Sequence, residues 1–191
     1  MSQNVRLERS SSVDAQGEAL PASVARVNQA DLETIFTAHY QRISRVLARV
    51  VRDRGRAEEL AVEVFLKWSK NPGAHGDGAA GWLYRTAVRM GLDELRREAR
   101  RSHYERLIGV LRRSPATPEE VRAADEDQRR VRTVLGALRA RDAGLLVLRS
   151  QGLRYDELAS AFGLNPSSIG TLIARAQRAF REEFVRRYGD Q

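Results

Sequence analysis

The chain of 191 residues contains no cysteine, which excludes disulfide bonds, thiolate nucleophiles and cysteine-ligated zinc. It has no run of about 18 apolar residues, the length that a membrane-spanning helix needs. The first 29 residues also lack the compact apolar core of a signal peptide. From these absences we expect a cytoplasmic protein with no membrane insertion.

The residues of the common catalytic motifs are also scarce. The three histidines, His39, His75 and His103, are scattered and show no His-Glu-x-x-His spacing for a metal. The glycines at 73, 76 and 78 precede no Gly-Lys-Ser/Thr, so they form no phosphate-binding loop. We therefore predict no catalytic residue, no cofactor and no metal, and we expect His75, in this glycine-rich loop, to be exposed to solvent.

Positive charge is abundant. The net charge is +8 and the pI is near 10.6, which favours a polyanionic partner held through its phosphates. Apolar residues make up 42% of the chain, enough to build real hydrophobic cores.

The apolar residues recur at helical spacing, and no strand pattern of convincing length occurs. We predict helices over 31–51, with Asp31 as N-cap and a break at 53–55, then over 56–69 and 80–101, and a second helical unit from about 125. The predicted fold is all-α, with two small helical domains joined by a flexible linker. The boundaries are a flexible N-terminal extension at 1–29, a first domain at 30–102, a linker at 103–127 and a second domain at 128–188.

Residues 155–178, YDELASAFGLNPSSIGTLIARAQR, have the pattern of a helix-turn-helix. Gly163 can take the left-handed conformation that ends a helix, Asn165 can cap the next helix, and Pro166 suits its first position. Such a unit places its second helix in a DNA major groove. A helical hairpin that packs and makes no DNA contact is the alternative.

Three segments together are more specific than the helix-turn-helix alone: AEELAVEVFLKW (57–68), GWLYRTAVRMGLDELRR (81–97) and residues 155–178. With them, residues 32–187 resemble a bacterial RNA polymerase sigma factor of the two-domain extracytoplasmic-function (ECF) group. The resemblance implies a first domain that binds core RNA polymerase and the promoter's minus-10 element. It implies a second domain that reads the minus-35 element, and an anti-sigma factor as a further partner.

The resemblance also implies roles for particular residues. Carboxylates on one helix face would meet the polymerase clamp: Glu59 and Glu63. Aromatic and guanidinium groups of the third helix would hold unpaired minus-10 bases: Trp82, Arg85, Arg89, Arg96 and Arg97. The minus-35 contacts would come from Ser167, Ser168, Thr171, Arg175 and Arg178. The glycine-rich loop would form a pocket for a flipped base.

Four positions depart from the family pattern. Val62 stands where a glutamine is usual and Arg89 where an asparagine is common, while Gly170 and Leu172 replace residues that are usually basic. The sequence predicts a transcription initiation factor that is not itself an enzyme. A diverged sigma-like regulator and a helix-turn-helix repressor, neither of which would direct initiation, are the alternatives.

Overall fold

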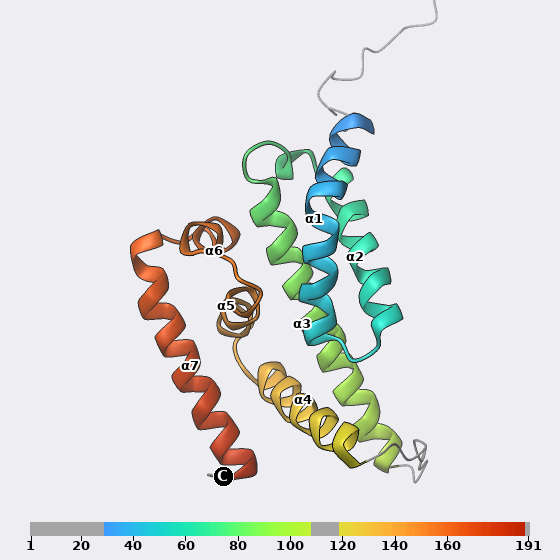
Figure 1. Ribbon diagram of the computed structural model, residues 1–191, viewed down its shortest axis with the longest axis vertical. Helices are drawn as coiled ribbons and strands as arrows, with labels where there is room; N and C mark the ends of the chain where they lie inside the picture. Colours follow the sequence, from blue (N-terminus) through green and yellow to red (C-terminus); the bar gives the residue numbers. More distant parts are fainter. Residues whose placement is uncertain (1–28, 108–118, 190–191) are drawn as a thin grey trace, which may run out of the picture.

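The computed structural model describes residues 29–107 and 119–189, and within them it contains α-helices, one short 3-10 helix and no strand (Figure 1). The predicted all-α class is therefore confirmed. The elements in chain order are α1 (Gln29–Val50), α2 (Arg54–Ser69), η1 (Pro72–Ala74), α3 (Ala79–Leu107), α4 (Glu119–Ala137), α5 (Ala140–Ser150), α6 (Tyr155–Phe162) and α7 (Pro166–Tyr188).

Two predicted segments fall partly outside the described residues. The N-terminal extension, 1–29, lies outside them except for Gln29, which begins α1. The centre of the predicted linker, 108–118, also lies outside them. Both described ends of that linker are helical, because α3 continues to Leu107 and α4 begins at Glu119.

Helix starts follow local capping chemistry. We predicted Asp31 as the N-cap of α1, but it lies within the first turn of the helix. A carboxylate there still interacts favourably with the helix dipole. The N-cap of α2 is Asp53, whose side chain accepts a hydrogen bond of 2.7 Å from the Arg56 backbone amide. Gly55 is therefore helical, and the break between α1 and α2 lies at 51–53.

The predicted helix-turn-helix is present as α6 and α7. Gly163 ends α6 at φ +62°, in the left-handed region that favours glycine. The Asn165 side chain then accepts a 3.0 Å hydrogen bond from the Ser167 amide, and Pro166 occupies the first turn of α7. The apolar side chains of Ile169 and Ile173, four residues apart on α7, are buried.

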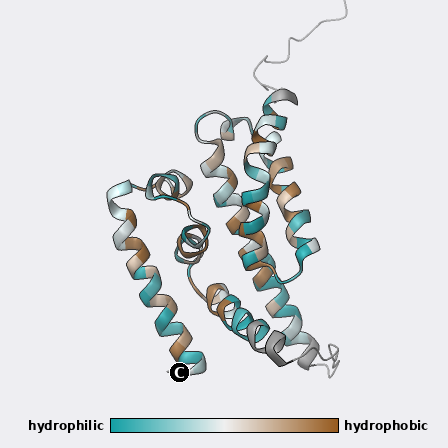
Figure 2. Cartoon of the chain, in the orientation of Figure 1, coloured by the Kyte–Doolittle hydropathy of each residue, from teal (hydrophilic) through white to brown (hydrophobic). Residues whose placement is uncertain are grey.

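The helices form two groups that pack against one another (Figure 1). The first half of the molecule is α1–α3 and the second half is α4–α7; α5 and α6 lie between α3 and α7. Hydrophobic positions line the inner faces of the helices (Figure 2). Buried side chains of both halves, such as Leu83, Leu92, Leu145 and Leu158, belong to one continuous cluster. The two halves therefore share a hydrophobic core.

Two glycines permit this close approach. A Cβ atom on Gly81 of α3 would lie 2.8 Å from the Ser160 hydroxyl oxygen and 3.0 Å from the Ser160 carbonyl group of α6. A Cβ atom on Gly144 of α5 would lie 2.7 Å from the Phe162 ring and 3.1 Å from Val88 of α3. At Gly81 the backbone of α6 leaves no room for a side chain, so the close approach of α3 and α6 requires glycine there. At Gly144 a side chain would require the Phe162 ring and Val88 to shift.

Candidate functional site

The two predicted polymerase-binding carboxylates lie together on the outer face of α2. The side chains of Glu59 and Glu63 are 67% and 43% exposed. Nη1 of Arg56 donates to both, over 2.9 and 3.2 Å, while Nη2 donates to Glu94 of α3 over 3.2 Å. The bond to Glu59 and the nearby Glu94 and Glu63 raise the pKa of Arg56. Glu94 also accepts a 3.2 Å hydrogen bond from Nη1 of Arg97, so three carboxylates face two guanidinium groups and the cluster keeps a negative excess.

An apolar pair that the sequence reading only partly identified lies among these carboxylates. Val62 is 42% exposed and Leu66, one helical turn further on, is 52% exposed. Large apolar side chains that lie exposed together on a helix indicate a binding surface. We name Glu59, Val62, Glu63 and Leu66 the α2 surface. Leu66 could have been identified from the sequence, because it lies four residues after Val62 and so on the same face of the helix.

The predicted minus-10 residues gather on one side of α3. Trp82, Arg85, Arg89 and Arg96 recur every three to seven residues and so share a face of the helix, with Arg97 beside it. Arg85, Arg89 and Arg97 are exposed, and Trp82 is more than half buried against the core. Cationic groups beside a partly buried ring are suited to unpaired nucleic acid.

Arg96 differs from the others in this group because it is hydrogen-bonded to the second half of the molecule. Its Nε donates to the Gly136 carbonyl and its Nη2 to the Leu138 carbonyl, each over 3.1 Å. These carbonyls lie at the C-terminal end of α4, where a helix leaves acceptors unsatisfied and favours a cation. A contact between Arg96 and DNA would therefore require α4 to move away from α3.

The glycine-rich loop before α3 is anchored by the end of α2. The buried indole of Trp68 donates from Nε1 to the Ala74 carbonyl over 2.9 Å. The His75 ring lies 4.6 Å from the Trp68 ring, and its Nε2 is 3.0 Å from the Trp68 carbonyl. The prediction of a solvent-exposed His75 is wrong, because this packing leaves it partly buried. Gly76 and Gly78, further along the loop, are exposed.

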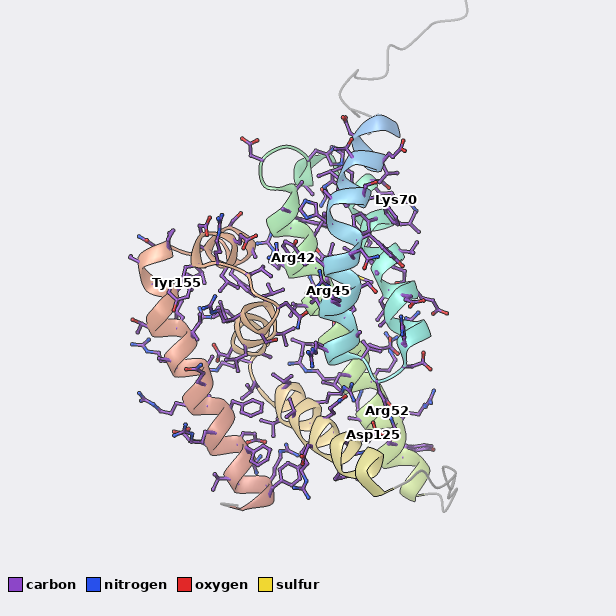
Figure 3. The ribbon with its side chains drawn as sticks, viewed as in Figure 1. Arg42, Arg45, Arg52, Lys70, Asp125 and Tyr155 are labelled. Carbon is purple, nitrogen blue, oxygen red and sulfur yellow. The ribbon has the colours of Figure 1, made fainter. Side chains whose placement is uncertain are left out.

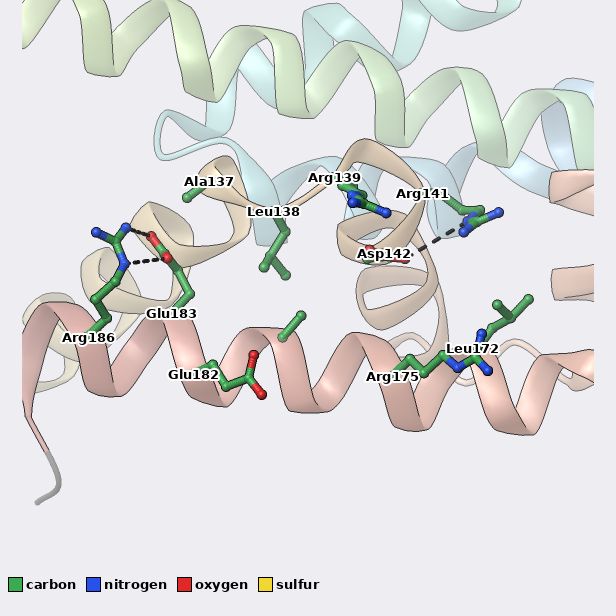
Figure 4. A pocket seen from close by; sticks show the side chains of 11 residues that line it. Ala137, Leu138, Arg139, Arg141, Asp142, Leu172, Arg175, Glu182, Glu183 and Arg186 are labelled. Carbon is green, nitrogen blue, oxygen red and sulfur yellow. Dashed lines mark hydrogen bonds and ion pairs between the residues drawn. The ribbon is translucent and has the colours of Figure 1, made fainter.

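The predicted minus-35 residues are all exposed on α7: Ser167, Ser168, Thr171, Arg175 and Arg178. The Ser167 hydroxyl already donates to Asn165 Oδ1 over 2.9 Å, so it forms part of the helix cap. Arg175 borders a shallow pocket of about 600 Å³ together with Arg139 and Arg141 from the corner between α4 and α5 (Figure 4). The same pocket is also lined by Asp142, Glu182 and Glu183, and Arg141 lies 3.9 Å from Asp142.

A polar junction, also missed in the sequence, joins the two halves beside the shared core. Arg42 of α1 donates from Nη1 to Glu157 of α6 over 3.0 Å, and the two side chains are 34% and 28% exposed. Figure 3 shows Arg42 on the side of α1 that faces the second half. Glu157 also accepts a 2.7 Å hydrogen bond from the Arg154 amide, which caps α6. The junction residues are separated by more than a hundred positions, so no sequence pattern relates them.

Two further side chains complete this junction. The Tyr84 hydroxyl lies 3.3 Å from Nδ1 of His39, within hydrogen-bond distance, and the Arg42 guanidinium lies 5.8 Å from the Tyr84 ring centroid. Burial, and then the charge of Arg42, lowers the pKa of His39, whereas burial raises the pKa of Tyr84. Both shifts favour the neutral forms of the two residues between the halves.

Within the described ranges, 29–107 and 119–189, no three His, Asp or Glu side chains are grouped so that they could hold a metal ion. None of the helices there is both long and apolar enough to cross a bilayer.

Comparisons with known proteins relate this chain to sigma factors. Residues 35–102 match the sigma-70 region 2 family. The chain is 29% identical to the ECF RNA polymerase sigma factor SigK of Mycobacterium bovis (strain BCG / Pasteur 1173P2) over 171 residues, which cover 86% of this chain and 91% of that protein. It is 27% identical to the RNA polymerase sigma factor CarQ of Myxococcus xanthus over 157 residues, which cover 78% and 87%.

Among solved structures, the sigma factor RpoE of Bartonella quintana, in complex with the anti-sigma factor NepR, is similar with a TM-score of 0.48 and 17% identity. The match covers 80% of this chain and 96% of that one. The family match at residues 35–102 includes the α2 surface and the predicted minus-10 residues of α3. Residues 35–102 therefore match the sigma-70 region 2 family, and the chain is similar in sequence to ECF sigma factors.

Proposed function

We propose that this chain is a transcription initiation factor that binds core RNA polymerase and directs it to specific promoters. The observation that carries the proposal is the presence, in one chain, of a sigma-70 region 2 domain and a separate helix-turn-helix whose recognition face is exposed. A repressor would need only the second of these. In this proposal the polymerase performs the chemistry, in the cytoplasm, and the chain supplies recognition.

The α2 surface is proposed as the polymerase contact. Its carboxylates can leave Arg56 and pair instead with basic groups of the polymerase. Val62 and Leu66 can bury their apolar surface in the same contact. This gives the departure at Val62 a physical meaning, because an apolar side chain here extends an apolar strip that already includes Leu66.

Promoter recognition is proposed to divide between the halves. Arg85, Arg89 and Arg97 on α3 would hold the melted minus-10 strand, with Arg96 joining them once α4 has moved away. On α7, Ser168, Thr171, Arg175 and Arg178 would enter the major groove at the minus-35 element, with Ser167 beside them. The division of the chain at 30–102 and 128–188 belongs to the same proposal, as does an anti-sigma factor among the partners.

The test is an initiation assay. Purified protein is added to bacterial core polymerase, and the 5′ ends of transcripts made on fragmented genomic DNA from its own source are sequenced. We expect new starts that share two upstream elements, and their loss in Arg175→Glu. Stable binding to core without new starts, by folded protein free of inhibitors, would contradict the proposal and support a diverged regulator.

A further inference from the structure

A pocket of about 1230 Å³ lies where α1 of the first half meets α4, α5 and α7 of the second. None of the residues of the α2 surface, of the predicted minus-10 group or of the predicted minus-35 group lines it. Small-molecule sites measure roughly 300–1,000 Å³ and occur preferentially at domain interfaces and between the helices of bundles. The position of this pocket is therefore that of a small-molecule site, and its volume has room for such a ligand.

Part of the pocket lining is apolar and accessible. Val131 of α4 is 40% exposed, and Leu146 of α5 and Phe180 and Phe184 of α7 are only partly buried. The rings of Phe180 and Phe184 are stacked, with an interplanar angle of 25° and centroids 6.2 Å apart. We name these four side chains the apolar lining. Apolar groups that water reaches in a concave site favour a ligand with an apolar body, because their contact removes both surfaces from water.

Four guanidinium groups also line the pocket: Arg45 and Arg49 of α1, Arg132 of α4 and Arg181 of α7. Figure 3 shows Arg45 on the side of α1 toward α5. Within the described ranges, none of the four has a carboxylate within ion-pair distance. The one acidic lining residue, Asp127, lies 3.9 Å from Arg130 instead. The pocket therefore keeps an excess of positive charge.

Arg132 lies in the most crowded part of this cationic group. Its Nε donates to the Arg49 carbonyl over 3.4 Å and its Nη2 to Gln128 over 3.1 Å, so both acceptors are neutral. Burial lowers the pKa of Arg132, and the nearby Arg52 and Arg49 act in the same direction, although Asp125 opposes them. An anion bound in the pocket would stabilise the charged form of this guanidinium.

We propose that this pocket binds a free amphipathic organic anion, a small molecule with an alkyl chain or ring system and one carboxylate or phosphate group. Guanidinium groups recognise carboxylates and phosphates through paired, charge-assisted hydrogen bonds, and the apolar lining requires an apolar body beside that group. Inorganic phosphate would leave the apolar lining bare, and a nucleic-acid backbone would place its charges against it at a high cost.

The bound molecule contacts α1 of the first half and α4, α5 and α7 of the second, so binding favours the arrangement in which the halves are packed together. In that arrangement the carbonyl groups of Gly136 and Leu138 accept hydrogen bonds from Arg96. Under the proposed function, on which this consequence alone rests, the ligand lowers initiation by keeping Arg96 from the minus-10 strand.

The experiment is isothermal titration calorimetry of the full-length protein with ligands whose saturated chains have the same length. Decanoate and decyl phosphate carry an anionic head, decanol carries a neutral head and decylammonium carries a cationic one. We expect both anions to bind, decanol to bind at least about tenfold more weakly, and decylammonium not to bind. The difference in affinity between decanoate and decyl phosphate identifies which anionic head the pocket takes. The bound anion should also raise the temperature of unfolding.

Two variants locate the site. Val131→Asp should weaken the binding of decyl phosphate at least about tenfold, because it places a carboxylate among apolar groups and adds negative charge to the pocket. The double variant Arg45→Gln/Arg181→Gln removes one cation from each half of the molecule. It should weaken binding similarly, with the largest effect at low salt.

The chain offers matched controls for both changes. Val185 of α7 is exposed to a similar extent, 38%, and does not line the pocket, so Val185→Asp should bind decyl phosphate as the unchanged protein does. Arg100 and Arg139 are exposed, lie one in each half and do not line the pocket. Arg100→Gln/Arg139→Gln therefore matches the arginine variant in its change of charge and should also bind normally.

Three binding results would overturn the proposal: no binding of either anion, decanol or decylammonium that binds as tightly as the anions, or equal binding to Val131→Asp and to the unchanged protein. In the initiation assay, decyl phosphate should lower transcription by the unchanged protein and not by Val131→Asp, and an equal response of the two would overturn the effect on initiation. Binding is measured without polymerase, so its failure and a failure of the proposed initiation activity are distinguishable.

Discussion

The contact between Gly81 and Ser160 gives the sharpest test of how the two halves are held together. In Gly81→Ala, the new methyl carbon would lie 2.8 Å from the Ser160 hydroxyl and 3.0 Å from its carbonyl carbon and oxygen. The hydroxyl can rotate away, but the backbone of α6 cannot, so α3 and α6 must separate. Overpacking of this kind costs about 1–3 kcal/mol, which lowers the docking equilibrium about 5- to 150-fold.

The same substitution has the opposite effect on α3 itself, since alanine is favoured over glycine within a helix by about 0.5–1 kcal/mol. The first half should therefore become slightly more stable while its association with the second half weakens. The chain has no cysteine, so labels at Lys70→Cys and Glu182→Cys, one in each half and both exposed, report the distance between the halves without interference. We expect a longer and broader distance distribution in Gly81→Ala than in the unchanged protein.

The control is Gly78→Ala, where no atom lies within 4 Å of the added carbon. It should leave the distance distribution unchanged. If Gly81→Ala and Gly78→Ala gave the same distribution as the unchanged protein, the α3–α6 contact would not be what holds the halves together, and the reasoning would be refuted.

Three further predictions concern stability and binding. Gly170→Ala should raise the free energy of unfolding by about 0.5–1 kcal/mol in chemical denaturation, because the nearest atom of Tyr155 is 3.6 Å from the added carbon and leaves room for it; a loss of stability would show that the space is occupied. Leu66→Asp should weaken binding to core polymerase in a pull-down while leaving the circular dichroism spectrum unchanged, since Leu66 is 52% exposed. Lys67→Asp, the control, should bind core polymerase as the unchanged protein does, because Lys67 is not part of the apolar pair of Val62 and Leu66. Because the pKa of His39 is lowered, the unfolded chain binds more protons than the folded one below the ordinary value of 6.5, so stability falls with falling pH, by at most about 1.4 kcal/mol per pH unit. His39→Gln should remove this slope between pH 7 and 5, and His103→Gln should retain it.

Local sequence chemistry predicted the elements well. Gly163, Asn165 and Pro166 define the turn of the helix-turn-helix through backbone conformation, a side-chain cap and a missing amide hydrogen, all of which act within a few residues. Periodicity also predicted the helices that the structure contains as α1, α2 and α3. Helix ends were less accurate, because α1 starts at Gln29 without the cap expected from Asp31, and α3 runs on to Leu107.

Local sequence patterns could not predict the contacts between the two halves. The ion pair of Arg42 with Glu157 and the capping of α4 by Arg96 join positions that are far apart in the chain, and each arginine looks like an ordinary surface cation in its own helix. Periodicity places Arg96 on the face of Arg85 and Arg89, as predicted, but only the tertiary packing shows that it is already engaged. The burial of His75 likewise depends on Trp68, seven residues away across a helix end.

The packing of α5 and α6 against α3 has a consequence for how the protein folds during its synthesis. The chain emerges from the ribosome N-terminal end first, so α1, α2 and α3 are complete before α5, α6 and α7 have been translated. The later helices then meet a face of α3 that already exists, with Gly81 open to receive Ser160. We expect the first half to act as a template for the second during synthesis, so that a circularly permuted chain beginning at α4 would fold more slowly than the natural order.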